Sequence, residues 1–167
     1  PQQNTMAGLI GNRAPNLDVA VASGGVVNLA DHAGSEVLVV ALWASYNNLC
    51  ENHLTTLKRV VERFGAQKVK LLAVNDGETP DVISRYLTHH KLDVPVGVDP
   101  NQAVADAFKV QQLPFVAMVD KQGTVQGIHL GLFGSLDRDV EADIEAILRG
   151  ESIAEQSKQR LNRRTGR

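Results

Sequence analysis

Cys50 is the chain's single cysteine, and it ends the stretch LWASYNNLC between an apolar run and a helical pattern. In the first turn of a helix, unpaired backbone N–H groups and the helix dipole favour a thiolate. His53 lies on the same helical face, where an imidazole can stabilise a thiolate or act as a base. We expect Asn47 or Asn48 to cap this helix. The alternative is a half-buried structural cysteine beside a solvated histidine, because free cysteines are often buried.

The cysteine count limits the available chemistry. A dithiol–disulfide cycle needs an attacking thiolate and a second thiol that resolves the mixed disulfide, so one cysteine excludes that cycle within this chain. Cys50 and His53 form a C-x-x-H pair, but tetrahedral zinc needs three or four ligands and the other histidines are scattered. We therefore expect neither a metal nor a cofactor.

The composition is typical of one globular domain. The chain has 167 residues, of which 43% are hydrophobic, and a net charge of −2 that gives no electrostatic reason to expect nucleic acid as a partner. The longest apolar run, 37–44, is too short to span a bilayer. We expect a disordered segment over 1–8, a domain over 9–150 and a flexible tail over 151–167. The end of that tail, KQRLNRRTGR, carries five positive charges and no acid.

The hydrophobic pattern predicts an α/β domain. Alternation around Gly24-Gly25 predicts a β-hairpin, while EVLVVALW and VKLLAVN predict strands covered on both faces. Helical spacing predicts a helix from Leu54 to Phe64, and Thr79-Pro80 is typical of the start of another, which extends to about His90. The remaining predicted elements are a strand near 94–98, a helix over 101–108, a hairpin around 121–123 and a closing helix over 137–148.

Three stretches in this order resemble the TlpA/ResA-like thiol–disulfide oxidoreductases, which belong to the AhpC/TSA group and have the thioredoxin fold. GNRAPNLDV is similar to their G-x-x-A-P-x-F segment, LVVALWAS to the strand before the active site, and VQQLPFVAMVDKQGTV to the segment with a cis-proline. The resemblance covers about 10–149. It implies a central mixed β-sheet flanked by helices, with an N-terminal β-hairpin. It also implies an extracytoplasmic location, periplasmic or exported, with a cytoplasmic location left open.

The active-site motif departs from the family pattern. Where the family has W-A-x-W-C-P-P-C, this chain has WASYNNLC, so the attacking cysteine aligns with Asn47 and the second cysteine with Cys50. Ala41 stands where thioredoxins proper carry a buried acid. Because an asparagine cannot attack a disulfide, the resemblance implies at most monothiol chemistry at Cys50, with a protein thiol or disulfide or a small thiol as partner.

A peroxidase would need one cysteine only. Aligned with the peroxiredoxins of the same group, Trp43 replaces their proline, Asn47 their hydroxyl residue, and Gln111 or Gln112 their arginine. Those groups hold the peroxide oxygens and stabilise developing charge. Since all of them are missing, we do not expect peroxidase activity.

Pro114 supports a hypothesis of another class. By resemblance it is the cis-proline beside the active-site turn, and the backbone of Leu113 can pair with an extended peptide. Trp43, Tyr46, Leu113 and Phe115 would then form an apolar rim, unless they simply close the core.

Two hypotheses for the function therefore stay open. The first is a monothiol oxidoreductase or thiol sensor, which requires an accessible Cys50 with a low pKa. The second is a redox-inactive binding module that docks an extended peptide or a thiol protein near Leu113-Pro114.

Overall fold

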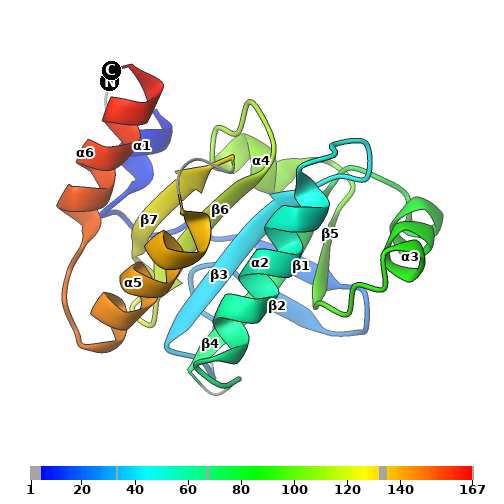
Figure 1. Ribbon diagram of the computed structural model, residues 1–167, viewed down its shortest axis with the longest axis horizontal. Coiled ribbons are helices and arrows are strands. Elements are labelled where there is room, and N and C mark those ends of the chain that lie inside the picture. Colours follow the sequence, from blue (N-terminus) through cyan, green and yellow to red (C-terminus); the bar gives the residue numbers. More distant parts are fainter. Residues whose placement is uncertain (1–4, 33, 67, 132–134, 167) are drawn as a thin grey trace.

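The computed structural model describes residues 5–32, 34–66, 68–131 and 135–166. Across these residues, seven strands form one mixed sheet in the order β2-β1-β5-β4-β3-β6-β7 (Figure 1). The strands are β1 (Asp18–Val21), β2 (Val26–Asn28), β3 (Val37–Trp43), β4 (Val69–Asp76), β5 (Val96–Asp99), β6 (Phe115–Asp120) and β7 (Val125–Leu130). The predicted α/β class and both predicted hairpins, β1–β2 and β6–β7, are confirmed.

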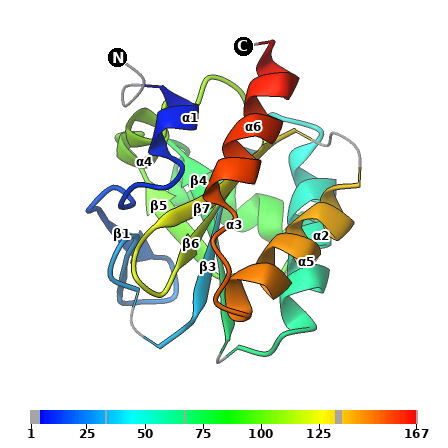
Figure 2. The ribbon, with the colours of Figure 1, turned by 90° about the vertical axis from the view of Figure 1, so that its left-hand side faces the viewer.

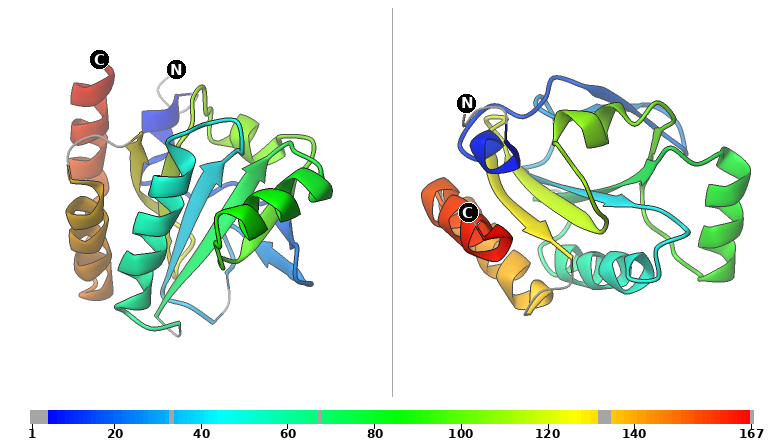
Figure 3. Two further views of the ribbon diagram at one scale, coloured as in Figure 1. Left: turned by 45° about the vertical axis from the view of Figure 1, so that its right-hand side comes forward. Right: turned by 90° about the horizontal axis from the view of Figure 1, so that it is seen from above.

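Helices cover both faces of the sheet. The helices are α1 (Met6–Leu9), α2 (Cys50–Glu62), α3 (Pro80–His89), α4 (Ala103–Ala107), α5 (Leu136–Leu148) and α6 (Ala154–Thr165). One apolar core lies beneath α2, α3 and α5, and a second lies beneath α1, α4 and α6, on the opposite side of the sheet (Figure 3). Every helix within the described ranges is too short or too polar to span a bilayer.

Strand β3 joins the two cores. It runs parallel to β4 and antiparallel to β6, and all its residues are buried. Val39 and Ala41 point into the core under α2, while Val40 and Leu42 point into the other core. This alternation is the period-two pattern of a strand covered on both faces, and it explains the continuous apolar run in the sequence.

The end of the chain differs from the predicted tail. Residues 154–165 form α6, which packs against β7 (Figure 2), with Ile153, Ser157 and Leu161 buried at helical spacing. A basic residue of this helix is also paired, because Arg160 donates to Asp143 of α5 at 2.8 Å. The sequence pattern missed this helix because its few apolar residues lie among many charges.

The start of the chain differs in a similar way. Helix α1 lies almost wholly within the segment expected to be disordered, and Thr5 caps it by accepting the Gly8 N–H at 3.0 Å. Residues 1–4 of that segment lie outside the described residues. A domain limited to 9–150 stays a prediction.

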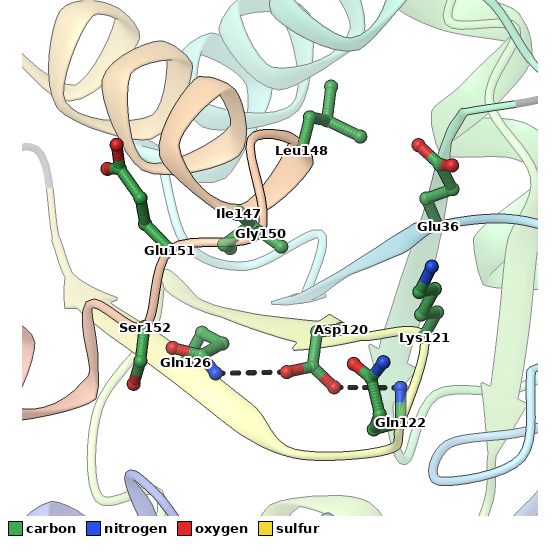
Figure 4. A pocket seen from close by; sticks show the side chains of 10 residues that line it. All are labelled: Glu36, Asp120, Lys121, Gln122, Gln126, Ile147, Leu148, Gly150, Glu151 and Ser152. Atoms are coloured by element: carbon green, nitrogen blue, oxygen red, sulfur yellow. Dashed lines mark hydrogen bonds between the residues drawn. The ribbon is translucent and has the colours of Figure 1, made fainter.

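Polar contacts fix the connection between α5 and α6. Figure 4 shows a cavity of about 180 Å³ there, next to the turn between β6 and β7. Asp120 accepts the backbone N–H of Gln122 and the side-chain amide of Gln126, each at 2.9 Å. Gln126 in turn accepts the Ile153 N–H at 3.0 Å. The cavity's main polar groups thus already have structural partners.

A second cavity, of about 380 Å³, is mainly apolar and lies where β3 and β4 begin. Leu38, Val69 and Leu71 are among the residues that line it. The turn that holds Cys50 follows the other end of β3, so this cavity and the Cys50 turn lie at opposite ends of the sheet.

Candidate functional site

The turn at 44–49 connects the end of β3 to the start of α2. The Asn47 N–H donates to Ala44 O at 3.3 Å, and the Cys50 N–H donates to Asn47 O at 3.1 Å. The helix cap is Leu49, which makes no side-chain capping bond, so the expected cap at Asn47 or Asn48 is wrong. Asn47 instead folds its side chain across the turn.

Asn47 joins the turn to the segment before β6. Its Nδ2 donates to Leu113 O at 3.0 Å, while its Oδ1 accepts the Leu49 N–H at 2.9 Å. The peptide bond between Leu113 and Pro114 is cis. The structure therefore brings together the two segments that the sequence singled out. Both ends of the Asn47 amide are occupied by backbone groups.

Cys50 is fully buried, at 0% exposure. Burial raises the pKa of its thiol, a hydrogen bond with the Ala44 backbone opposes this effect, and the negative charge of Glu78 adds to it. The cysteine is therefore a neutral thiol without solvent access. The helix N-terminus favours a thiolate, but removing the thiol from water disfavours the thiolate more strongly.

His53 is also fully buried and lies on the packed face of α2. Neither ring nitrogen is in hydrogen-bonding geometry with a partner. Burial lowers its pKa to about 4, against a weaker opposing effect of the Phe115 backbone, and His129 lowers it further. The imidazole is thus neutral at pH 7, and the solvated or charged histidine considered from the sequence is wrong.

Two of the four residues expected to form an apolar rim belong to the core. Trp43 and Phe115 are both at 0% exposure. The Trp43 indole donates to Ala73 O at 3.1 Å and its ring lies 5.0 Å from that of Tyr86. Pro114 is buried as well, whereas Leu113 is half-buried.

Tyr46 and Leu49 form the apolar surface of the turn. They are 70% and 49% exposed, and Val26 on β2 is the other large exposed apolar residue of the described ranges. The sequence analysis singled out Tyr46 but missed Leu49. Leu49 precedes the first residue of α2, so the helical pattern gave no signal for its exposure.

Glu78 holds the turn from the side of β4, and the sequence did not single it out. Its carboxylate accepts the Ser45 N–H at 2.7 Å, the Ser45 hydroxyl, and the side-chain amide of Asn75 at 2.9 Å. The Glu78 backbone N–H donates a hydrogen bond to Asn75 Oδ1 at 2.9 Å. The one available signal was Asn75, a polar residue near the end of a mainly apolar strand.

Groups suited to a metal ion do not gather at this turn. Across the described ranges, no three residues among the histidines, the cysteine and the acids lie close enough together to hold one. The chemistry available at the site is therefore hydrogen bonding by exposed backbone groups, apolar contact and negative charge.

Comparisons with known proteins agree with the fold. Residues 10–128 match the model of the AhpC/TSA family. A protein named thiol-disulfide oxidoreductase ResA from Geobacillus kaustophilus is 27% identical over 138 residues, which are 83% of this chain and 78% of that protein. The ResA of Halalkalibacterium halodurans is 25% identical over 137 residues, which are 82% of this chain and 76% of that protein.

Solved structures show the same architecture. A crystal structure from Chlorobium tepidum, of a candidate thiol:disulfide interchange protein DsbE, has a TM-score of 0.73 and 27% identity, and the match covers 83% of this chain and 96% of that one. StoA from Bacillus subtilis has a TM-score of 0.64 at 15% identity, covering 76% and 94%, and shows likeness of fold alone. The predicted thioredoxin-like fold is confirmed.

The burial of Cys50 predicts slow alkylation. We expect iodoacetamide to modify the native protein at least about a hundredfold more slowly than the urea-unfolded chain, because reaction must wait for opening of the first turn of α2. The native pH midpoint should lie above the 9.0 of an unperturbed thiol. Mass spectrometry of samples quenched over time at several pH values measures both, and a fast native reaction with a lower midpoint would contradict the prediction.

The neutral His53 predicts a loss of stability in acid. The unfolded imidazole binds a proton near pH 6.5, but the buried one does so only near pH 4, so stability is full above pH 6.5 and falls below it. We expect the free energy of unfolding to drop by about 3 kcal/mol from pH 7 to pH 4 through this residue. In urea titrations, His53→Leu should lose that part of the pH dependence; parallel curves for variant and native chain would refute it.

Proposed function

This chain belongs to the AhpC/TSA family as a TlpA/ResA-type member, and on that premise we propose that it is a redox-inactive binding module that docks an extended peptide beside Leu113-Pro114. The TlpA/ResA-type relatives are thiol–disulfide oxidoreductases, whose partners are proteins with thiols or disulfides. In our proposal this chain keeps the docking of a protein segment and lacks the exchange reaction.

The observation that carries the proposal is the complete burial of Cys50, together with its raised pKa. Monothiol chemistry requires an accessible thiolate, and this site offers neither access nor a stabilising cation. Asn47, which aligns with the family's attacking cysteine, has no nucleophilic atom, and its amide is hydrogen-bonded to Leu113 O and Leu49 N–H.

The surface of the turn suits an extended peptide. Leu113 lies two residues before the start of β6, and within the described part of the chain its N–H makes no hydrogen bond. A peptide strand can accept that N–H, while its side chains contact Tyr46 and Leu49. Because Asn47 already binds Leu113 O and Leu49 N, the turn is held in place before a partner arrives. Such preorganisation reduces the entropy that binding must overcome.

The place of action follows the family as well. We propose that the chain works outside the cytoplasm, where a docking partner is an exported protein segment. No part of the docking argument depends on this location.

Removing the exposed apolar side chains tests the docking surface. The double variant Tyr46→Ser and Leu49→Ser should weaken binding of fluorescein-labelled extended peptides, with apolar residues at alternate positions, by at least about fivefold. Fluorescence anisotropy gives the affinity, and amide shifts of Leu113 in NMR spectra locate the peptide.

The matched control is Val26→Ser, which removes an equally exposed apolar side chain from β2. It should leave the affinity unchanged. Equal losses in both proteins, or no binding by the native chain at any peptide concentration tested, would overturn the proposal.

Restoring a second thiol tests the redox half of the proposal. With oxidised glutathione, Asn47→Cys should form one intrachain disulfide, because two thiols give two electrons and two protons to glutathione disulfide and release two glutathione molecules. The variant should then reduce insulin disulfides in the presence of a reductant, whereas the native chain should not.

Asn48→Cys is the control, since it creates C-x-C spacing in place of C-x-x-C. It should gain little or no activity. Insulin reduction by the native chain, or failure of Asn47→Cys to form the disulfide, would show that Asn47 does not occupy the attacking position.

A further inference from the structure

Three carboxylates lie near the turn that carries Tyr46 and Leu49. Glu78 binds the Ser45 N–H at 2.7 Å, which places its charge beside Tyr46. Asp76 ends β4 next to it, and together these two acids raise the pKa of the Tyr46 phenol, after the larger effect of its partial burial. Glu51 opens α2 two residues after Leu49 and, with Glu78, adds to the effect of burial that raises the pKa of Tyr86 to about 12.

No lysine or arginine of the described residues neutralises these acids. Every ion pair of a lysine or arginine in those ranges lies elsewhere on the molecule. Asp76 accepts only the neutral amide of Gln102, at 3.2 Å, and Glu51 pairs with His90 at 3.0 Å. The exposed apolar pair Tyr46 and Leu49 is therefore bordered by carboxylates that no lysine or arginine of the described residues pairs with.

We propose that the docked peptide carries a lysine or arginine next to the apolar residue that contacts Tyr46 and Leu49. This inference rests on the proposed function and names the chemistry of its partner. The apolar side chain covers the two exposed side chains, and the cation lies before Asp76, Glu78 and Glu51. Opposite charges across an interface steer encounter and suppress partners of the wrong charge.

A second copy of this chain fits the surface less well. Its most basic segment is α6, but that segment is helical and packed on β7. Arg160 and Arg164 of this helix are already paired with Asp143 and Asp139, at 2.8 and 3.4 Å. An extended cationic segment of another protein can bind both the Leu113 N–H, which has no partner among the described residues, and the acids that no described lysine or arginine pairs with.

Three synthetic peptides test the inference. They share a central Val-Phe pair and differ only in the flanking residues, which are lysine, serine or glutamate. By fluorescence anisotropy at low salt, we expect the lysine peptide to bind about tenfold more tightly than the glutamate peptide, with the serine peptide between them. Raising the salt concentration should reduce the difference, because exposed charges are screened.

Matched variants locate the effect. Asp76→Asn and Glu51→Gln should each weaken binding of the lysine peptide about twofold to threefold and leave the serine peptide unchanged. Glu62→Gln is the control. Glu62 ends the same helix that has Glu51 in its first turn, roughly 16 Å away along the helix, and the variant should change neither affinity.

The outcomes separate this inference from the proposed function. If all three peptides bind with equal affinity, the surface docks peptides but does not select a cation, and this inference alone is wrong. If none binds, the proposed function fails and this inference fails with it. Loss of lysine-peptide binding in Glu62→Gln as large as in Glu51→Gln would also overturn the inference.

Discussion

The complete burial of β3 is the constraint on which the rest of the site depends. Its side chains alternate between two apolar cores, so the strand cannot shift without exposing one set or the other. The turn after Trp43 must therefore leave the sheet at a fixed point. Helix α2 then packs back onto the strand through Cys50, His53 and Leu54. The burial of the thiol is a consequence of this packing: Cys50 is the first residue of the stripe that seals the core.

Asn47 aligns with the attacking cysteine of the family motif. In the dithiol members of the family, the residue that aligns with Asn47 attacks a disulfide held beside the cis-proline. Here that residue is an amide whose Nδ2 and Oδ1 both bind backbone groups of the site. These hydrogen bonds hold the turn against the segment before β6. In our proposal, this contact gives the chain a preformed docking surface.

Negative charge acts on both the thiol and the surface of the turn. Burial is the larger cause of the raised pKa of Cys50 and of Tyr46, and the charge of Glu78 adds to it in both cases. No cation of the described residues lies in an ion pair with Glu78. A negative field disfavours a thiolate, which the thiol-exchange reaction needs. The same field attracts a positive side chain from outside. In our proposal, Glu78 both disfavours a thiolate at Cys50 and helps to attract a cationic partner.

The sequence by itself determined the α/β order, the family and the limit of one thiol, because strand periodicity, short motifs and the cysteine count are local properties. It also singled out the turn and Leu113-Pro114, which the structure then shows in contact.

Only the tertiary structure decided that Trp43 and Phe115 lie in the core, that Leu49 is exposed and that Glu78 holds the turn. These features depend on which residues meet across β3, β4 and β6. The tertiary structure also decided that α6 forms. This helix is stabilised by buried Leu161 and by the Arg160–Asp143 pair rather than by its own polar sequence. The state of Cys50 belongs to the same group: a helix start suggests a thiolate, but the packing above β3 removes the water that a thiolate requires.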